Sequence, residues 1–154
     1  MRRMAARSFA STLSTRCAAG LLGLFLLLAP GTAPAGEVPV FLGAIGVGRA
    51  RPEVESELRS LLRAELAATD FTRVKTNERY MLSATLVRLD SVQSSDTVRA
   101  TCVISVAVLR DGSTLHALVQ GRATAEEARP TAARRDALRA AVHSAMIRVP
   151  KALR

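Results

Sequence analysis

Aromatic residues are scarce in this sequence, and their scarcity excludes a class of ligand. The 154 residues include no tryptophan, one tyrosine and four phenylalanines, together 3% of the chain. Proteins that bind nucleic acid usually combine a basic groove or a basic helix with stacking aromatic side chains. The 22 basic residues form no dense run, so we expect no nucleic-acid binding. A net charge of +9 nevertheless favours weak affinity for anionic surfaces.

Histidine and cysteine are equally scarce, with two of each. Neither His116 nor His143 has a cysteine or carboxylate at the spacing of metal ligands, so we expect no metal and no cofactor. Cys102 lies in the alternating run TCVISVAVL, and we interpret it as a small buried hydrophobic residue. A reactive or intermolecular thiol is the alternative.

Residues 1–35 have the order of a secretory signal peptide. Four arginines and no acidic residue precede an uncharged apolar run at 18–29, and a small-x-small site ends at Ala35. The run is shorter than the ~20 residues that a membrane span needs. A lipid anchor would need a cysteine just after the run, whereas Cys17 precedes it. We predict a periplasmic or secreted domain of residues 36–154, with an uncleaved anchor as the alternative.

The remaining pattern predicts one α+β domain in two layers, with the order β-α-β-β-β-β-α and a mostly antiparallel sheet. A first strand is expected at 38–47 and a short second strand at 71–76. Pro52 fits the first position of a helix. A second amphipathic helix is expected at 131–149, ended by Pro150. Apolar residues recur at helical spacing in both helices: Val54, Leu58, Leu61, Leu62 and Leu66, then Leu138, Ala141, Val142, Ala145, Met146 and Val149.

Residues 80–125 predict a three-stranded meander. Asp111-Gly112 is a strong signal for a two-residue hairpin turn, which places Ile104 opposite Val119. A first turn centred near Ser94 places Val87 opposite Cys102. One face then forms the core: Val87, Leu89, Cys102, Ile104, Val106, Val108, Leu115, Ala117 and Val119. The other face mixes Leu82, Ala84, Leu86, Val103, Ala107 and Leu118 with Ser105, His116, Gln120 and Arg122.

Two features invite a chemical interpretation. Gly43, Gly46 and Gly48 match neither the dinucleotide fingerprint nor the phosphate loop, so we interpret them as close packing and a turn into the first helix. Glu65 points into the apolar stripe of that helix. Because a buried carboxylate is costly unless it is paired, we expect an ion pair with Arg122 or Arg139 at the core margin. A catalytic carboxylate is the alternative.

Three segments resemble a group of small periplasmic domains. They are Tyr80-Met81-Leu82 at the start of a strand, Gly121-Arg122-Ala123 at the end of the meander, and the alanine-rich helix 137–145. The chain thereby resembles the curli-secretion channel protein CsgG, the lipoprotein activators of penicillin-binding proteins and the amino-terminal domain of TolB. The resemblance implies a non-enzymatic module that docks onto envelope proteins. No lipid-anchor cysteine and no pore-forming insertion is found, so it implies neither anchoring nor channel formation.

We therefore expect a non-enzymatic, exported cell-envelope domain that mediates protein–protein interaction or assembly. The alternatives are a secreted inhibitor of a hydrolase, or a small enzyme that uses Glu65 or Cys102. Two weakly charged surfaces are candidates for docking an envelope protein or a second copy. The first is the outer side of the second helix, with Ala137, Ala140, Ser144 and Ile147. The second is the mixed sheet face around Leu82, Leu86, Val103 and Leu118.

Overall fold

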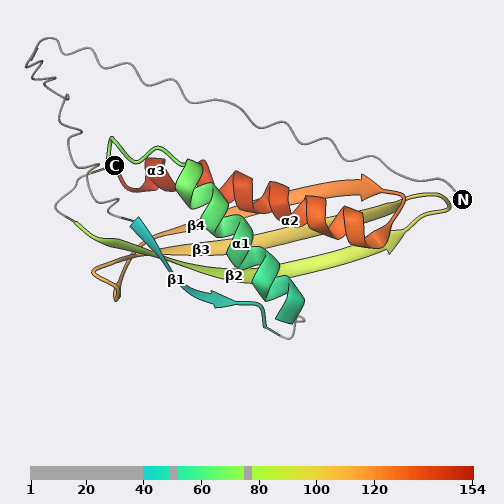
Figure 1. Cartoon of the computed structure of the whole chain (residues 1–154), viewed down its shortest axis with the longest axis horizontal. Coiled ribbons are helices and arrows are strands. Elements are labelled where there is room, and N and C mark those ends of the chain that lie inside the picture. Colours follow the sequence, from blue (N-terminus) through green and yellow to red (C-terminus); the bar gives the residue numbers. More distant parts are fainter. Residues whose placement is uncertain (1–39, 49–51, 75–77) are drawn as a thin grey trace, which may run out of the picture. The chain divides into compact units, whose positions relative to one another are not determined.

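The computed structural model describes residues 40–48, 52–74 and 78–154 (Figure 1). The predicted signal peptide and its cleavage after Ala35 lie outside these residues. Within them the elements are β1 (Val40–Gly46), α1 (Pro52–Ala68), β2 (Tyr80–Gln93), β3 (Val98–Arg110), β4 (Thr114–Glu127), α2 (Pro130–Met146) and α3 (Val149–Ala152). The α+β class and the mostly antiparallel sheet are confirmed.

The four strands lie in the order β1-β2-β3-β4, with β1 parallel to β2 and the other neighbours antiparallel. A parallel pair needs a crossover connection, and α1 supplies it. The prediction of a short strand at 71–76 is wrong for residues 71–74, the part that the structure describes. These residues form a turn in which the Val74 N–H donates to the Phe71 carbonyl at 2.9 Å. Phe71 and Val74 instead add buried side chains to the core.

Both long helices cover the same face of the sheet (Figure 1). Helix α2 packs on β3 and β4, while α1 packs beside α2 and against β1. The core lies between the helices and this face, and its members come from every layer. Six residues from the two apolar stripes and the predicted core face of the sheet are at most 1% exposed: Leu58, Leu62, Ile104, Val106, Val142 and Met146.

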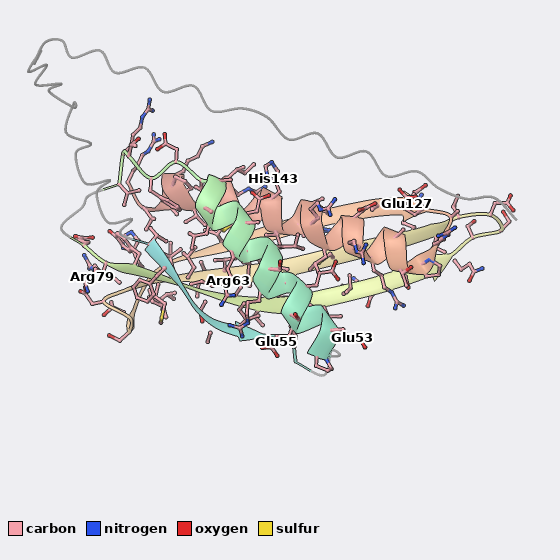
Figure 2. The ribbon with its side chains drawn as sticks, in the orientation of Figure 1. Glu53, Glu55, Arg63, Arg79, Glu127 and His143 are labelled. Atoms are coloured by element: carbon pink, nitrogen blue, oxygen red, sulfur yellow. The ribbon has the colours of Figure 1, made fainter. Side chains whose placement is uncertain are left out.

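The sequence of α1 explains where this helix begins. Pro52 occupies its first position, and Glu53 and Glu55 in the first turn face the positive end of the helix dipole (Figure 2). Arg59 forms an ion pair with Glu55 at 3.0 Å, one turn apart. These local interactions and the apolar stripe favour a helix over the same segment. The predicted start of α1 at Pro52 is confirmed.

The second predicted helix is divided in two. Helix α2 ends at Met146, and Pro150 lies inside the short helix α3 instead of ending α2. A proline has no N–H to donate to the carbonyl four residues earlier, so the α-helical ladder must stop before it. Proline is well tolerated in the first turn of a helix, and this is where α3 places it.

Two irregularities in the sheet change the predicted register. Val87 of β2 is left unpaired between Leu86, which opposes Ile104, and Arg88, which opposes Val103. His116 of β4 is left unpaired between Leu115 and Ala117 in the same way. Ile104 opposes Gly121 instead of Val119, because the β3–β4 turn and His116 each add one residue. Cys102 opposes Leu89 instead of Val87, because Gln93 opposes Val98 across a β2–β3 turn that is longer than predicted. Because side chains alternate between faces, an extra residue sends those beyond it to the other face.

Gly43 and Gly48 serve packing and a turn, as predicted, whereas Gly46 has room for a side chain. A Cβ atom at Gly43 would lie 2.6 Å from the side chain of Met81, so a larger residue here would force that side chain to move. Gly48 has a φ of +57°, a conformation that favours glycine.

Candidate functional site

The strongest candidate site is the face of the sheet that the helices leave uncovered, here called the open face. Side chains on the helix-covered face, such as Leu82, Ala84 and Val106, are at most 1% exposed. Their neighbours along the strands, such as Ser83, Ser105 and Ala107, are partly exposed because no described element lies over them. The open face is thus a broad surface made by all four strands.

A row of large apolar side chains crosses one end of the open face. Phe41 of β1 opposes Met81 of β2, Met81 opposes Leu109 of β3, and Leu109 opposes Leu115 of β4. Phe41 is 46% exposed and Leu115 is 60% exposed. Leu118, which opposes Ala107, adds a further side chain that is 61% exposed. We call these five residues, Phe41, Met81, Leu109, Leu115 and Leu118, the apolar row.

The irregularity at His116 completes the apolar row. Leu115 was expected in the core, but the longer turn places it on the open face opposite Leu109, and the unpaired His116 returns Ala117 to the helix-covered face. His116 itself contacts the ring of Tyr80, with the two ring centroids 5.4 Å apart. The expectation that His116 shares the uncovered face with Leu118 is therefore wrong, because Tyr80 is a buried residue of the core.

The other end of the open face is polar. Arg88 pairs with Asp90 along β2, and Arg99 of β3 pairs with Glu126 of β4 at 2.5 Å. The hydroxyls of Thr101 and Thr124 lie 3.3 Å apart across the same two strands. Exposed ion pairs of this kind contribute little to stability. The open face is therefore divided into an apolar end near the β3–β4 turn and a polar end near the β2–β3 turn.

Only part of the sheet surface predicted from the sequence lies on the open face. Val103 is partly exposed there and Leu118 is prominent. The prediction is wrong for Leu82 and Leu86, which are 0% and 9% exposed and lie in the core. The cause is the unpaired Val87, which moves the preceding residues of β2 by one position relative to β3. Phe41, Met81 and Leu109 were not predicted for this surface, although the alternating pattern of residues 80–86 would place Met81 on the face opposite Leu82.

The predicted helix surface is also only partly correct. Ala140 is exposed, Ser144 is partly exposed and Ile147 is 55% exposed, so these three residues do lie on the outer side. Ala137 is 0% exposed and packs in the core, which removes it from this surface. A single isoleucine among small and polar residues is a weaker surface for docking than the apolar row.

A histidine–glutamate pair lies near the C-terminal ends of α1 and α2. His143 Nδ1 donates to Glu65 Oε2 at 3.1 Å, so the predicted pairing of Glu65 with Arg122 or Arg139 is wrong. The pair lines a hollow of about 430 Å³ that also contains Asp70, Arg73 and Arg154. The Thr69 hydroxyl there already donates to the Glu65 carbonyl at 2.6 Å. The hydrogen bonds that Thr72 donates hold the pKa of Asp70 below its ordinary value, so this carboxylate stays charged.

Cys102 and Tyr80 are buried residues with ionisable side chains, and their surroundings suit a role in packing. Cys102 is 0% exposed, as predicted, and burial raises the pKa of its thiol to about 12. A thiol with such a pKa is a poor nucleophile at neutral pH. The hydrogen bond from the Tyr80 hydroxyl to Glu78 raises the pKa of this tyrosine, and burial adds to the effect. Among residues 40–48, 52–74 and 78–154, no three histidine, cysteine or acidic side chains come together as metal ligands.

No protein-family model and no curated protein matches the chain. Solved structures are similar at low identity. A protein of Caulobacter crescentus CB15 described as a lipoprotein has 16% identity and a TM-score of 0.43, over 71% of this chain and 86% of that one. A minor lipoprotein from Acinetobacter baumannii has 9% identity and a TM-score of 0.48, over 75% and 92%. A PelC dodecamer from Paraburkholderia phytofirmans has 21% identity and a TM-score of 0.39, over 79% and 90%.

These comparisons assign no family and no function to the chain. Two of the three proteins are described as lipoproteins, and none of the three is named as CsgG, as an activator of a penicillin-binding protein or as TolB. The finer resemblance therefore stays a prediction. In the part of the chain that the structure describes, no helix is both long and apolar enough to cross a membrane.

Proposed function

We propose that the chain is a non-enzymatic domain of the cell envelope that binds another envelope protein through the apolar row. The observation that carries the proposal is the exposure of Phe41, Leu115 and Leu118 on one uncovered end of a sheet. Contiguous exposed apolar side chains are uncommon on monomeric proteins and mark sites of interaction. The signal-like order of residues 1–35 supports an envelope location.

The partner should present a flat apolar surface rimmed by polar groups. The apolar row is bounded by the turn at Asp111-Gly112 on one side and by Ser83 and Ser105 on the other. Interfaces commonly have this order, with an apolar centre and a polar rim. An inhibitor of a hydrolase usually inserts a protruding loop into its target. The turn at 94–97 is instead closed by a bond from the Ser94 N–H to the Thr97 carbonyl at 2.8 Å, and it offers no such loop.

The proposal is tested by two charge substitutions with matched exposure. A photoreactive residue at position 115 should crosslink the partner in intact cells, and mass spectrometry then identifies the adduct. Leu118→Glu should abolish the adduct, because it places a charge in the centre of the contact. Ile147→Glu is the control, since Ile147 is similarly exposed but lies on the helix layer.

Both variants should unfold at the same denaturant concentration as the parent, because both side chains lie on the surface. An adduct that survives Leu118→Glu would contradict the proposal. An adduct lost with Ile147→Glu alone would move the docking site to the outer side of α2.

A further inference from the structure

The two edges of the sheet are protected very differently. Strand β1 has 7 residues and its register shifts between Leu42 and Ile45, so it offers little regular backbone. Strand β4 has 14 residues and pairs with β3 without interruption from Ala117 to Glu127. Proteins usually protect a long edge with a proline, a lysine or a bulge, because its free N–H and C=O groups can pair with another strand. Between 117 and 127, β4 has none of these features.

Among the described residues, one side chain bonds to the backbone of this edge. Arg148 donates from Nη1 to the backbone carbonyl of Gln120 at 3.1 Å. In an antiparallel edge strand, alternate residues turn both backbone polar groups away from the sheet. Gln120 is such a residue, so Arg122, Thr124 and Glu126 have the same orientation. No described hydrogen bond reaches the outward backbone groups of these three residues, and they form an open segment of the edge.

The side chains of this segment complement those of a second copy of the segment that runs in the opposite direction. Arg122 and Glu126 lie on the same face of β4, and each is two positions away from Thr124. Glu126 already pairs with Arg99, whereas Arg122 has no ion pair with any described residue. When two copies of β4 run antiparallel through Thr124, each Arg122 opposes the Glu126 of the other copy. Opposite charges across paired strands stabilise the pair, and like charges destabilise it.

The charges favour this register over those centred on Arg122 or Glu126. A pairing centred on Arg122 would oppose the two Arg122 side chains, and one centred on Glu126 would oppose the two Glu126 side chains. A pairing centred on Gln120 would need the carbonyl that Arg148 occupies. Centring on Thr124 leaves Ala123 opposite Ala125 on the helix side, where small side chains let the strands approach closely.

We infer that the chain forms a symmetric homodimer in which the β4 strands of two copies pair antiparallel about Thr124. The two four-stranded sheets then join into one continuous sheet, with the helices of both copies on the same side. Such an interface is isologous, because each copy contributes the same segment. This surface is separate from the apolar row, so the inference does not depend on the proposed function.

Single cysteine substitutions test the register in the full chain, purified in the form in which the cell accumulates it. Thr124→Cys should give a disulfide-linked dimer under mild oxidation, because the two thiols would meet on the symmetry axis. Leu118→Cys is the matched control, on the same strand and face. Six residues from the axis, its two copies would be roughly 40 Å apart at about 3.4 Å per residue. The native Cys102 is buried and does not interfere.

Sedimentation velocity tests the charge pairing. Arg122→Glu should weaken the dimer about tenfold, since it places like charges opposite each other twice in the interface. Arg139→Glu, an equal charge change on the exposed side of α2, should leave the dimer unchanged. Crosslinking at position 118 as fast as at 124, or a dimer unaffected by Arg122→Glu, would overturn the inference. So would a parent protein that sediments only as a monomer.

Discussion

Gly121 of β4 lies directly against Ala141 of α2. A Cβ atom at Gly121 would come within 2.0 Å of the Ala141 carbonyl oxygen and 2.9 Å of the Ala145 Cβ atom. Real side chains never approach so closely, so the helix could remain in place only if this residue has no side chain. The contact explains why α2 is rich in alanine on its buried side and why a glycine interrupts a regular strand.

Gly121→Ala should therefore lower the free energy of unfolding by about 1–3 kcal/mol, the usual cost of overpacking a core. Urea unfolding measures it. Gly46→Ala is the control, because the nearest atom to its added Cβ would be Thr85 Oγ1 at an ordinary 3.6 Å. Equal stability of the two variants would show that α2 can move away from β4 without cost.

The element types could be predicted because several local signals agree in each segment. In α1, the proline at the start, the acidic first turn and the 3.6-residue periodicity favour one helix. The Asp-Gly signal located the turn, since Asp111 and Gly112 have φ values of 50° and 76°, but the predicted register is wrong, because Arg110 opposes Thr114 and three residues lie in the turn. Positive φ at both central residues is the requirement of the tight hairpin turn that this dipeptide predicts.

The assignment of residues to faces could not be completed from the pattern. Val87 and His116 have side chains that fit a strand, so nothing in their identity marks them as unpaired. One such residue was enough to place Leu82 and Leu86 on the wrong face and to hide the apolar row. Similarly, the partner of Glu65 depends on how α1 and α2 cross, and this crossing places His143 nearest to it.

Leu62→Ala should destabilise the domain by about 2–5 kcal/mol, because a fully buried leucine leaves a cavity between helix and sheet. Thermal or denaturant unfolding gives the difference. Leu115→Ala, which removes the same atoms from an exposed position, should change the stability by about 0.5 kcal/mol at most. A loss for Leu62→Ala as small as the control would show that α1 does not pack as described.

Export and cleavage after Ala35 remain predictions from the sequence. The basic start, the apolar run and the small-x-small site direct signal peptidase to this bond. The intact mass of the protein recovered outside the cytoplasm should match a chain that begins at Gly36. Ala35→Arg should block cleavage, because the enzyme requires a small residue there. A full-length mass in the membrane fraction would instead support the uncleaved anchor.

Burial of Cys102 should make the stability depend on alkaline pH. Because the thiol pKa is raised from 9.0 to about 12, the folded state keeps a proton that the unfolded state releases above about pH 9. The raised pKa adds to the free energy of unfolding, and this addition is fully present below about pH 9. It is lost as the pH rises toward 12, with a slope of up to about 1.4 kcal/mol per pH unit. The stability advantage of the parent over Cys102→Ala should therefore shrink between about pH 8 and pH 10.5.

Urea unfolding of both proteins across this range measures the difference and cancels the titration of the other groups. Thiol labelling of the folded protein gives an independent check, with Ser95→Cys as an exposed thiol for comparison. Cys102 should react far more slowly than the thiol at position 95, because the reagent must wait for the core to open. A stability difference that stays constant with pH, or native labelling of both thiols at equal rates, would show that Cys102 is accessible to solvent.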